Sequence, residues 1–398
     1  MNLVLVINSG SSSLKYQVVD PGDGGWLARG LVERIGQEGS RIRHEVPGAD
    51  PLERDVPLAD HAEALESVLA LLDGAGPGLA RLVAVGHRVV HGGSEYRDPV
   101  VVDDDVEDAI ARIVPLAPLH NPAALLGIRE MRRLLPSVPQ VAVFDTAFHA
   151  GMPAEAYTYA LPVDVARAHR LRKYGFHGTS YAYVTRRAAA FLGVPRGEVR
   201  LIICHLGNGA SMAAVRDGVG VDTSMGLTPL QGLVMGTRSG DVDPAVVFHL
   251  VRAAGMGLDE VDDVLNRQSG LKGLAGHQDM REVRRRANDG DAAARLALDV
   301  YAYRVRAYIG AYLAAVPGVQ ALVFTAGIGE NDAALRQEVC GPLGHLGIAV
   351  DGERNAEVSG ADRAIDDGTG PIRVLVIPTD EEAEIARQAM AAVGGDTP

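Results

Sequence analysis

The stretch VLVINSGSSSLKYQVV, residues 4–19, contains two apolar segments separated by a short loop rich in glycine and serine. The two segments have the composition of β-strands, and so short a polar loop between them predicts a hairpin. The loop and its flanks carry Asn8, three consecutive serines and Lys15. A hairpin tip of this kind offers backbone N–H groups, hydroxyls and one ammonium group to a phosphate, and glycine lets the backbone approach closely.

Two further loops are similar to the first. Residues 201–215, LIICHLGNGASMAAV, again place a glycine-rich loop between two predicted strands, and a third predicted strand, 321–325, is followed by AGIGEN. Glycine, serine and asparagine also make ordinary turns, so one such loop alone indicates little. Three of them, two on the same strand–loop–strand frame in the two halves of the chain, indicate a duplicated nucleotide-binding architecture that handles ATP.

Length and composition narrow the function classes. The chain has 398 residues, enough for two or three domains, and its 47% hydrophobic and 22% charged residues are typical of a globular protein. The formal net charge of −13 and the lack of a dense basic run argue against nucleic-acid binding. No stretch reads as a membrane span or signal peptide, and two cysteines form no disulfide framework. We therefore expect a cytoplasmic protein without a nucleic-acid or membrane partner.

Strands precede helices in each half of the chain. In the first half we predict strands within 1–20 and 26–47 and at 82–90 and 138–144, and helices at 61–73, 104–114 and 122–135. In the second half we predict strands at 199–206, 210–216, 219–223, 320–326 and 372–377, and helices at 178–193, 243–255, 259–267, 279–289, 291–316 and 381–393. This order predicts an α/β fold with two similar domains around a central cleft, a common position for a ligand site.

Polar residues gather where apolar strands end, which is where open α/β sheets place ligand groups. Arg88 lies at the end of one buried run and needs an anionic partner, either a structural carboxylate or a substrate. Asp145 ends another run and fits a helix cap as well as a functional carboxylate. No P-loop, Rossmann or nucleophile-elbow motif occurs in the sequence. The glycine-rich loops, arginines and carboxylates that remain fit phosphoryl transfer by positioning and charge neutralisation.

Nine motifs in order along the chain resemble the acetate kinase (acetokinase) family. They are NSGSSSLKY, GHRVVHGG, PLHNP, FDTAFH, YGFHGTS, HLGNGAS, MGTRSGDVDP, GIGEN and TDEEAEIAR. The resemblance implies the duplicated fold of the acetate and sugar kinase, chaperone ATPase and actin superfamily, in a homodimer. It also implies an N-terminal domain of residues 1–148 plus 382–398 and a C-terminal nucleotide-binding domain of residues 149–381. The implied reaction is reversible, in-line transfer of the ATP γ-phosphoryl group to acetate, giving acetyl phosphate and ADP with Mg²⁺, or Mn²⁺ as an alternative.

The resemblance further implies roles for single residues. The implied catalytic residues are Asp145, His177 and Arg238, and the implied metal residues are Asn8 and Glu381. The implied substrate-binding residues are Arg88, Val90, Leu119, His120, Phe176 and Pro229. The implied nucleotide-binding residues are Lys15, His205, Leu206, Gly207, Asn208, Gly209, Asp279, Met280, Arg281, Gly327, Ile328, Gly329, Glu330 and Asn331.

The expected chemistry agrees with these roles. Acetate has a pKa of about 4, so it is ionised at pH 7 and needs no strong general base. The obstacle is to bring this anion onto the γ-phosphate of another anion. Arg88 and Arg238 would clamp the two anions, Mg²⁺ would neutralise the leaving ADP, and His177 would donate to the equatorial oxygens. We expect Asp145 to help place the metal or the phosphoryl group rather than to remove a proton.

The sequence departs from the family pattern in three places. Tyr181 follows GTS where the family usually has histidine, which alters local packing more than chemistry. Asp380 replaces asparagine and adds negative charge beside Glu381, which bears on metal affinity. His277 and Gln278 replace a small serine or asparagine, which bears on the nucleotide pocket and its base preference.

Two alternative functions stay open at this stage. A kinase for propionate or butyrate would use the same mechanism, and Val90 and Phe176 leave little room for the longer acid. One methylene group is nevertheless worth only about 1–3 kcal/mol of discrimination. A non-catalytic ATP-binding module related to actin or chaperones would not require Arg88 and Arg238 beside a small apolar pocket.

Overall fold

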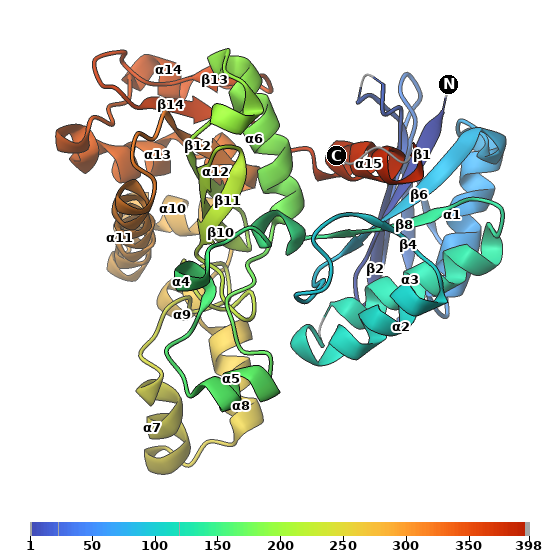
Figure 1. Cartoon of the computed structure of the whole chain (residues 1–398), viewed down its shortest axis with the longest axis horizontal. Helices are drawn as coiled ribbons and strands as arrows, with labels where there is room; N and C mark the ends of the chain where they lie inside the picture. Colours follow the sequence, from blue (N-terminus) through green and yellow to red (C-terminus); the bar gives the residue numbers. More distant parts are fainter. Residues whose placement is uncertain (1, 23, 119, 395–398) are drawn as a thin grey trace. The chain divides into compact units, whose positions relative to one another are not determined.

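The computed structural model describes residues 2–22, 24–118 and 120–394 (Figure 1). Leu119, expected in the substrate pocket, lies outside the described residues. The chain divides into two compact units, one of Met1–Phe148 with Asp380–Pro398 and one of His149–Thr379. No helix in the described ranges is both long and apolar enough to cross a membrane.

The first unit is built on an eight-stranded sheet with the strand order β5-β4-β3-β2-β1-β6-β8-β7. The strands are β1 (Leu3–Ser9), β2 (Ser13–Val19), β3 (Trp26–Glu33), β4 (Arg41–Glu45), β5 (Leu52–Asp55), β6 (Leu82–Val89), β7 (Val100–Val101) and β8 (Gln140–Phe144). β1 and β2 form the antiparallel hairpin that the opening stretch predicts, with Asn8 opposite Lys15. β6 and β8 continue the sheet in parallel on the other side of β1.

Helices cover both faces of this sheet. They are α1 (His61–Ala75), α2 (Asp104–Ile113), α3 (Asn121–Leu134) and the C-terminal α15 (Glu381–Gly394), with short helices η1 (Leu79–Arg81), η2 (Val114–Leu116) and η3 (Ala147–His149). Alternate residues of β1 face opposite ways, as a strand requires. Leu3 and Leu5 pack in the cluster that includes α1, whereas Val4 packs in the cluster with Ile385 of α15. The C-terminal helix is therefore part of the core of the first unit.

The second unit repeats the central arrangement of the first. Its six-stranded sheet has the order β11-β10-β9-β12-β14-β13. The strands are β9 (Leu201–Leu206), β10 (Ala210–Arg216), β11 (Val219–Thr223), β12 (Ala321–Thr325), β13 (Arg363–Ala364) and β14 (Arg373–Val376). β9 and β10 form the second predicted hairpin, and β12 and β14 add in parallel. The five strands β11-β10-β9-β12-β14 thus have the order and directions of β3-β2-β1-β6-β8, which confirms the predicted duplication.

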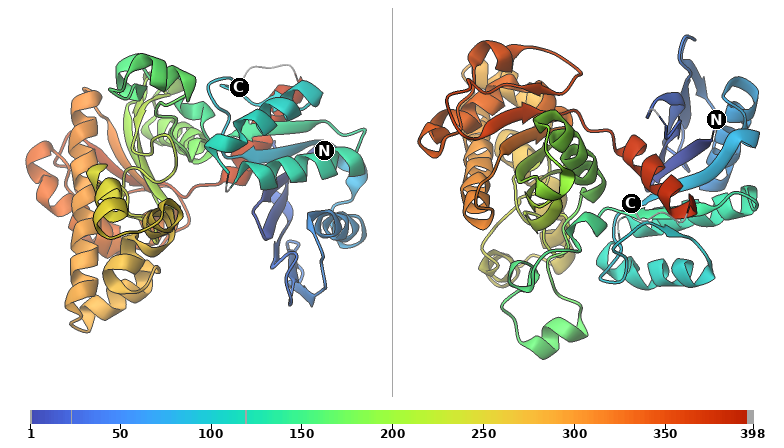
Figure 2. Two further views of the ribbon diagram at one scale, coloured as in Figure 1. Left: turned by 90° about the horizontal axis from the view of Figure 1, so that it is seen from below. Right: turned by 45° about the horizontal axis from the view of Figure 1, so that its top comes forward.

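The helices of the second unit pack on this sheet and extend beyond it. They are α4 (Ala154–Tyr157), α5 (Val163–Ala168), α6 (Gly178–Leu192), α7 (Ala245–Ala253), α8 (Leu258–Asp263), α9 (Gly270–Ala275), α10 (Met280–Asn288), α11 (Ala292–Ala315), α12 (Ala326–Asn331), α13 (Ala333–Cys340) and α14 (Gly352–Ala356). The short helices are η4 (Arg196–Glu198), η6 (Gly341–Leu346) and the π-helix η5 (Val264–Gln268). α11 is a long straight helix beside the sheet (Figure 2).

Two segments of the second unit differ from their prediction. The helix predicted at 259–267 divides into α8 and the π-helix η5. The glycine-rich segment after β12, predicted as a loop, is the short helix α12. This helix is stable because its carbonyl groups find donors: the amide of Asn331 donates to Gly327, and the guanidinium of Arg336 donates to Gly329 and Glu330.

Candidate functional site

The first unit brings three of the predicted site residues together. Arg88, at the end of β6, donates from Nε and Nη2 to Oδ2 of Asp145, at 3.0 and 2.7 Å. Asp145 directly follows β8, the parallel neighbour of β6. Nη1 of Arg88 lies 3.5 Å from Oε2 of Glu381, the first residue of α15. Parallel strands and the returning C-terminal helix therefore gather one cation and two carboxylates, as expected for strand ends in such a sheet.

The charges in this cluster support one another. Burial works against the charged guanidinium of Arg88, but the carboxylates of Asp145 and Glu381 more than offset it, and the pKa of Arg88 is raised. Burial raises the pKa of Glu381, and Arg88 opposes this effect. The side chain of Asp145 is 1% exposed, whereas those of Arg88 and Glu381 are each 19% exposed. Asp145 thus holds a permanently charged guanidinium whose outer part stays accessible to an anion.

The hairpin residues Asn8 and Lys15 lie opposite each other on β1 and β2. The ammonium group of Lys15 forms an ion pair with Glu382 of α15 and is half exposed. In the described part of the chain, no group of three or more histidine, cysteine or acidic side chains is arranged to hold a metal. The resemblance assigns Asn8 and Glu381 to a different kind of site, in which Mg²⁺ would keep several waters and bind through one or two protein oxygens together with substrate phosphates.

The loop after β6 is tied to the start of α3. Asn121 accepts the backbone N–H of His91 at 3.1 Å and donates to its carbonyl group at 2.9 Å. Asn121 follows His120, which is half-buried at the start of α3, and Val90 is half-buried beside this loop. Nothing in the local sequence marks Asn121 as the link, although it lies in the PLHNP motif.

In the second unit, the imidazole of His177 is fixed at the start of α6. His177 has a left-handed backbone with φ of 58°, which is uncommon for a residue other than glycine. Its Nδ1 lies 2.8 Å from Oγ of Ser211 on β10. Its ring stacks on that of His205, with centroids 4.2 Å apart and planes inclined by 18°. The ring plane is therefore held from two directions.

Arg238 points to the same place as His177. A Cβ atom added to Gly209 would lie 3.7 Å from both Nη1 of Arg238 and Nε2 of His177, so the two side chains converge on the glycine loop between β9 and β10. Arg238 Nη1 donates to the carbonyl group of Pro229 at 3.1 Å. Among the residues that the structure describes, no carboxylate forms an ion pair with Arg238, and burial lowers its pKa. A partly buried guanidinium without a carboxylate partner has the charge and the donors to bind an anion.

The loop that carries Arg238 is anchored at both ends. Asp241 accepts the N–H of Gly232 at 2.9 Å and the hydroxyl proton of Tyr308 on α11 at 2.7 Å. Thr237 donates to the carbonyl group of Asn266 in the π-helix η5, at 2.9 Å. Such π-turns are frequent at functional sites. These anchors were not predicted from the sequence, although Asp241 lies in the MGTRSGDVDP motif.

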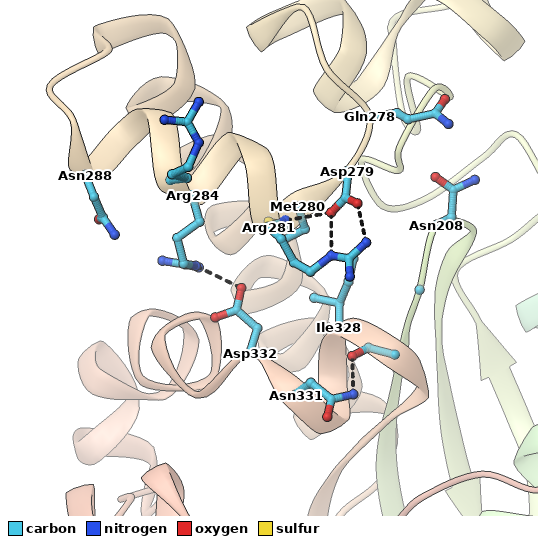
Figure 3. A pocket seen from close by; sticks show the side chains of 13 residues that line it. Asn208, Gln278, Asp279, Met280, Arg281, Arg284, Asn288, Ile328, Asn331 and Asp332 are labelled. Carbon is cyan, nitrogen blue, oxygen red and sulfur yellow. Dashed lines mark hydrogen bonds and ion pairs between the residues drawn. The ribbon is translucent and has the colours of Figure 1, made fainter. Parts of the chain in front are cut away.

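A cavity of about 840 Å³ opens beside the glycine loop of the second unit (Figure 3). Its lining consists of Gly207, Asn208, Gln278, Asp279, Met280, Arg281, Arg284, Arg285, Asn288, Gly327, Ile328, Asn331 and Asp332. Asp279 caps α10 by accepting the N–H of Arg281, and its ion pair with the Arg281 guanidinium lowers the pKa of Asp279 to about 2. The size and the mixed polar and apolar lining suit a nucleotide-sized ligand.

Comparison with known proteins identifies the family of this chain. A model of the acetokinase family matches residues 3–387. The chain belongs to the acetokinase family. It is 54% identical over 397 residues to the acetate kinase of Clavibacter michiganensis subsp. michiganensis, with 99% of this chain and 100% of the relative covered. It is 56% identical over 395 residues to the acetate kinase of Leifsonia xyli subsp. xyli, with 99% of each chain covered.

Two solved structures of this family are similar in fold. The acetate kinase of Porphyromonas gingivalis has a TM-score of 0.94 and 41% identity, covering 99% of this chain and 100% of that chain. A propionate kinase from Francisella tularensis subsp. tularensis has a TM-score of 0.93 and 39% identity, covering 98% and 99%. The acetokinase fold is thus the duplicated α/β fold described above, and it is shared by kinases named for two different acids.

The predicted nucleotide-binding residues of this acetokinase-family chain fall into two sets. Eight of them line the cavity: Gly207, Asn208, Asp279, Met280, Arg281, Gly327, Ile328 and Asn331. The other six do not line it. His205 and Leu206 are buried in β9, Gly329 is buried in α12, and Gly209 faces His177 and Arg238. Glu330 accepts the N–H of Thr379, and Lys15 belongs to the first unit. Four further residues line the cavity and were not predicted from the sequence: Arg284, Arg285, Asn288 and Asp332.

Two predicted substrate residues of the second unit lie near Arg238 and His177 in the chain. Phe176, directly before His177, is buried with 2% exposure, and its carbonyl group faces Nε2 of His149 at 3.0 Å. Pro229 is half-buried, and its carbonyl group accepts the hydrogen bond from Arg238. Both are apolar residues, Phe176 next to His177 in the chain and Pro229 hydrogen-bonded to Arg238 through its carbonyl group.

Proposed function

We propose that this member of the acetokinase family transfers the γ-phosphoryl group of ATP directly and reversibly to acetate, giving acetyl phosphate and ADP. The observation that carries the proposal is the convergence of Arg238 and His177 on Gly209, with no carboxylate of the described residues paired to Arg238. Two donors aimed at one point beside a glycine loop suit the equatorial oxygens of a phosphoryl group in transfer.

The reaction needs charge neutralisation more than proton transfer. Acetate is ionised at pH 7, so its carboxylate oxygen attacks without a general base. Arg88, held by Asp145, binds and orients this carboxylate, while Arg238 and His177 donate to the phosphoryl oxygens as negative charge spreads over them. Asp145 therefore acts through Arg88. This role is additional to the one expected from the sequence, in which Asp145 helps to place the metal or the phosphoryl group.

We propose that the nucleotide occupies the cavity of the second unit. The eight predicted residues that line it would contact adenosine and phosphates, and Gly209 and His205 would shape the phosphate end. Gln278, one of the departures from the family pattern, lines the cavity and is placed to affect base preference. Lys15 would reach the phosphates only after exchanging its partner Glu382.

The metal of the reaction is proposed to be Mg²⁺, with Mn²⁺ able to replace it. Asn8 and Glu381 would hold it with one amide and one carboxylate oxygen. When bound, the ion neutralises charge on the nucleotide phosphates and the leaving ADP. Removal of divalent metal with EDTA is expected to abolish acyl phosphate formation, and addition of Mg²⁺ in excess is expected to restore it.

Acetate is proposed as the preferred acid because the substrate residues implied by the resemblance, Val90 in the first unit and Phe176 and Pro229 in the second, have apolar side chains, which suit a methyl group. The similarity to a propionate kinase structure favours measurable turnover of propionate as well. One methylene group changes the transition-state energy by only about 1–3 kcal/mol. We also propose that the protein acts in the cytoplasm, where ATP is available.

A homodimer is proposed from the apolar surface at one end of the second unit. α7 has no buried residue, and its Val246 and Phe248 are 38% and 57% exposed. Leu258, at the start of the neighbouring α8, is 71% exposed. A nine-residue helix is marginal in water without tertiary packing, and a second copy of the chain would supply it.

The dimer proposal is tested by light scattering after size exclusion. Phe248→Asp is expected to shift the protein from dimer to monomer, because it would bury a charge in the interface. Val358→Asp is the control, since Val358 is 93% exposed and distant in sequence from this surface. A Phe248→Asp protein that stays dimeric would contradict the proposed surface.

The activity is tested by trapping the acyl phosphate as a hydroxamate with acetate, propionate and butyrate. Arg238→Ala is expected to lower kcat by about a thousandfold or more while the protein stays folded. Arg200→Ala is the matched control, because Arg200 pairs only loosely with Asp217 at the outer end of β9 and is expected to be fully active. A preference for longer acids would overturn the proposed acid. ATP binding without any acyl phosphate would indicate a binding module instead.

A further inference from the structure

A chain of three hydrogen-bonding side chains ends at His177. The hydroxyl group of Tyr181 lies 2.6 Å from Oγ of Ser211, and this Oγ lies 2.8 Å from Nδ1 of His177. Tyr181 is in the first turn of α6, four residues after His177, and Ser211 is on β10. Tyr181 and Ser211 are completely buried. Because the structure keeps these two hydroxyl groups away from bulk solvent, their protons are shared within the protein.

The chemistry of the two hydroxyl groups gives the chain a direction. A serine hydroxyl has one proton to donate. The phenol is the more acidic of the two groups and hence the better donor, and burial raises the pKa of Tyr181 well above its usual value, so Tyr181 keeps its proton. When Tyr181 donates to Ser211, the proton of Ser211 turns to Nδ1 of His177. A neutral imidazole that accepts at Nδ1 carries its own proton on Nε2.

Nε2 is the nitrogen that faces the glycine loop. It and Nη1 of Arg238 would each lie 3.7 Å from a Cβ atom added to Gly209. A histidine protonated at Nε2 is a donor there without being charged, whereas the other tautomer would present a lone pair to the oxygens of a phosphoryl group and repel them.

We infer that Tyr181 is a positioning residue which, through Ser211, fixes His177 as the tautomer protonated at Nε2. This inference rests on the proposed function, since it concerns the donor that His177 offers to the phosphoryl group. The other contacts of His177 hold its ring plane: His205 stacks on it, and Ser180 bridges Nδ1 of His205 and Oγ1 of Thr379, at 2.8 Å each. Tyr181 adds what stacking cannot supply, namely the direction of the hydrogen bond at Nδ1.

Tyr181→Phe tests the inference because it removes the hydroxyl group and keeps the ring, which lies edge-on to His149 with centroids 5.4 Å apart. We expect kcat to fall by about tenfold, as for the loss of one buried hydrogen bond that acts in the transition state. The KM values for ATP and acetate should change by less than about twofold, since the tautomer matters most when charge moves onto the phosphoryl oxygens. Tyr181→His, which restores a side chain able to donate, is expected to recover part of kcat.

A double-mutant cycle distinguishes a relay from independent packing. If Tyr181 acts through Ser211, the variant Tyr181→Phe with Ser211→Ala should be no slower than Ser211→Ala alone. Multiplied losses would overturn the inference, because they would mean that the two side chains act separately. If Tyr181→Phe does not fold, Ser211→Ala still tests the link to His177, because it removes the hydrogen bond at Nδ1 of His177.

The tautomer itself is read from ¹⁵N chemical shifts of labelled histidine, with His177→Gln used to assign the signal. The native protein should show His177 protonated at Nε2, and Tyr181→Phe should show a mixture of tautomers. An unchanged tautomer in Tyr181→Phe would overturn the inference. This reading needs no turnover: a native protein that forms no acyl phosphate defeats the proposed function, whereas the spectrum still decides the role of Tyr181.

Discussion

Arg88 donates two N–H groups to one oxygen of Asp145, at 3.0 and 2.7 Å, and its Nη1 lies 3.5 Å from Oε2 of Glu381. The pair joins the ends of two adjacent parallel strands. Because Asp145 is buried and Arg88 is partly exposed, the carboxylate is the fixed partner and the guanidinium is the group that can meet a substrate.

The first prediction concerns this pair. Asp145→Ala is expected to raise the KM for acetate by about ten- to a hundredfold, since hydrogen bonds to a charged group contribute about 1.5–3 kcal/mol and Arg88 would lose its orientation. Steady-state kinetics with acetate as the varied substrate measures this effect. Asp98→Ala is the control, because Asp98 is exposed in the same unit. An Asp145→Ala enzyme with native kinetics would show that Arg88 needs no partner.

The second prediction concerns the anchor of the Arg238 loop. Asp241 binds Gly232 at the start of the loop and Tyr308 on α11, and Asp241→Ala removes both contacts. We expect kcat to fall by about ten- to a hundredfold, because misplacing a catalytic group by about 1 Å costs up to a hundredfold. Tyr308→Phe keeps the contact to Gly232 and should lose less.

Steady-state kinetics and circular dichroism on the same preparations check this expectation. Asp299→Ala, which alters an exposed aspartate on α11, is the matched control. If Asp241→Ala keeps the native kcat, the loop is held by Thr237 and the π-helix without Asp241.

The two hairpins could be predicted from sequence because their determinants are local. An apolar run, a glycine-rich loop and a second apolar run lie within 16 residues of one another, and β1–β2 and β9–β10 formed as predicted. The order of strands within the sheets depends on contacts between distant segments, for which the sequence carries no local signal. The same holds for Lys15, whose partner Glu382 lies at the other end of the chain.

Some elements were not predicted from the sequence for a similar reason. α13 contains Arg336, which interrupts the apolar pattern and yet is only 1% exposed. Its guanidinium is accommodated by the carbonyl groups of Gly329, Glu330 and Asn355 and by the side chain of Asn355. A charge satisfied by backbone groups is indistinguishable in sequence from a charge on the surface. The link from Tyr181 through Ser211 to His177 was missed because it joins a helix to a strand.

The third prediction concerns stability at low pH. His87 on β6 is buried, with Nε2 2.8 Å from Oε1 of Gln140, and burial lowers its pKa to about 4 despite this hydrogen bond. In the unfolded chain a histidine has a pKa of about 6.5. Between these values the unfolded chain takes up a proton that the folded chain does not, so stability falls as the pH drops from about 6.5 toward 4.

His87→Gln is expected to reduce this dependence. From pH 7 to pH 5 the native protein should lose about 2 kcal/mol more than the variant in the free energy of unfolding. His91, whose pKa burial also lowers to about 4, contributes in the same direction in both proteins. Denaturant unfolding followed by the fluorescence of Trp26, the single tryptophan, reports on the first unit. Parallel pH curves for the two proteins would contradict the prediction.

The fourth prediction concerns Asp380, where the family pattern has asparagine. Its Oδ1 accepts the N–H of Ala383 at 2.8 Å, so Asp380 caps the start of α15. Asparagine caps helices equally well, and Asp380→Asn should leave the free energy of unfolding within about 0.5 kcal/mol of native, whereas Asp380→Ala should cost about 1 kcal/mol. The helix thus tolerates either residue, and the difference between them is the charge.

That charge adjoins Glu381, the proposed metal residue, and burial raises the pKa of Asp380 as it would for a carboxylate short of positive partners. A bound divalent ion relieves this cost, so Asp380→Asn should raise the Mg²⁺ concentration for half-maximal activity by about two- to fivefold, the range of a partly screened charge pair. The titration is made at fixed ATP and low ionic strength, with Asp380→Ala as the comparison. Both variants lose the same charge and should shift equally, although only one loses the cap. Superimposed Mg²⁺ curves for native and Asp380→Asn proteins would place the metal away from the start of α15.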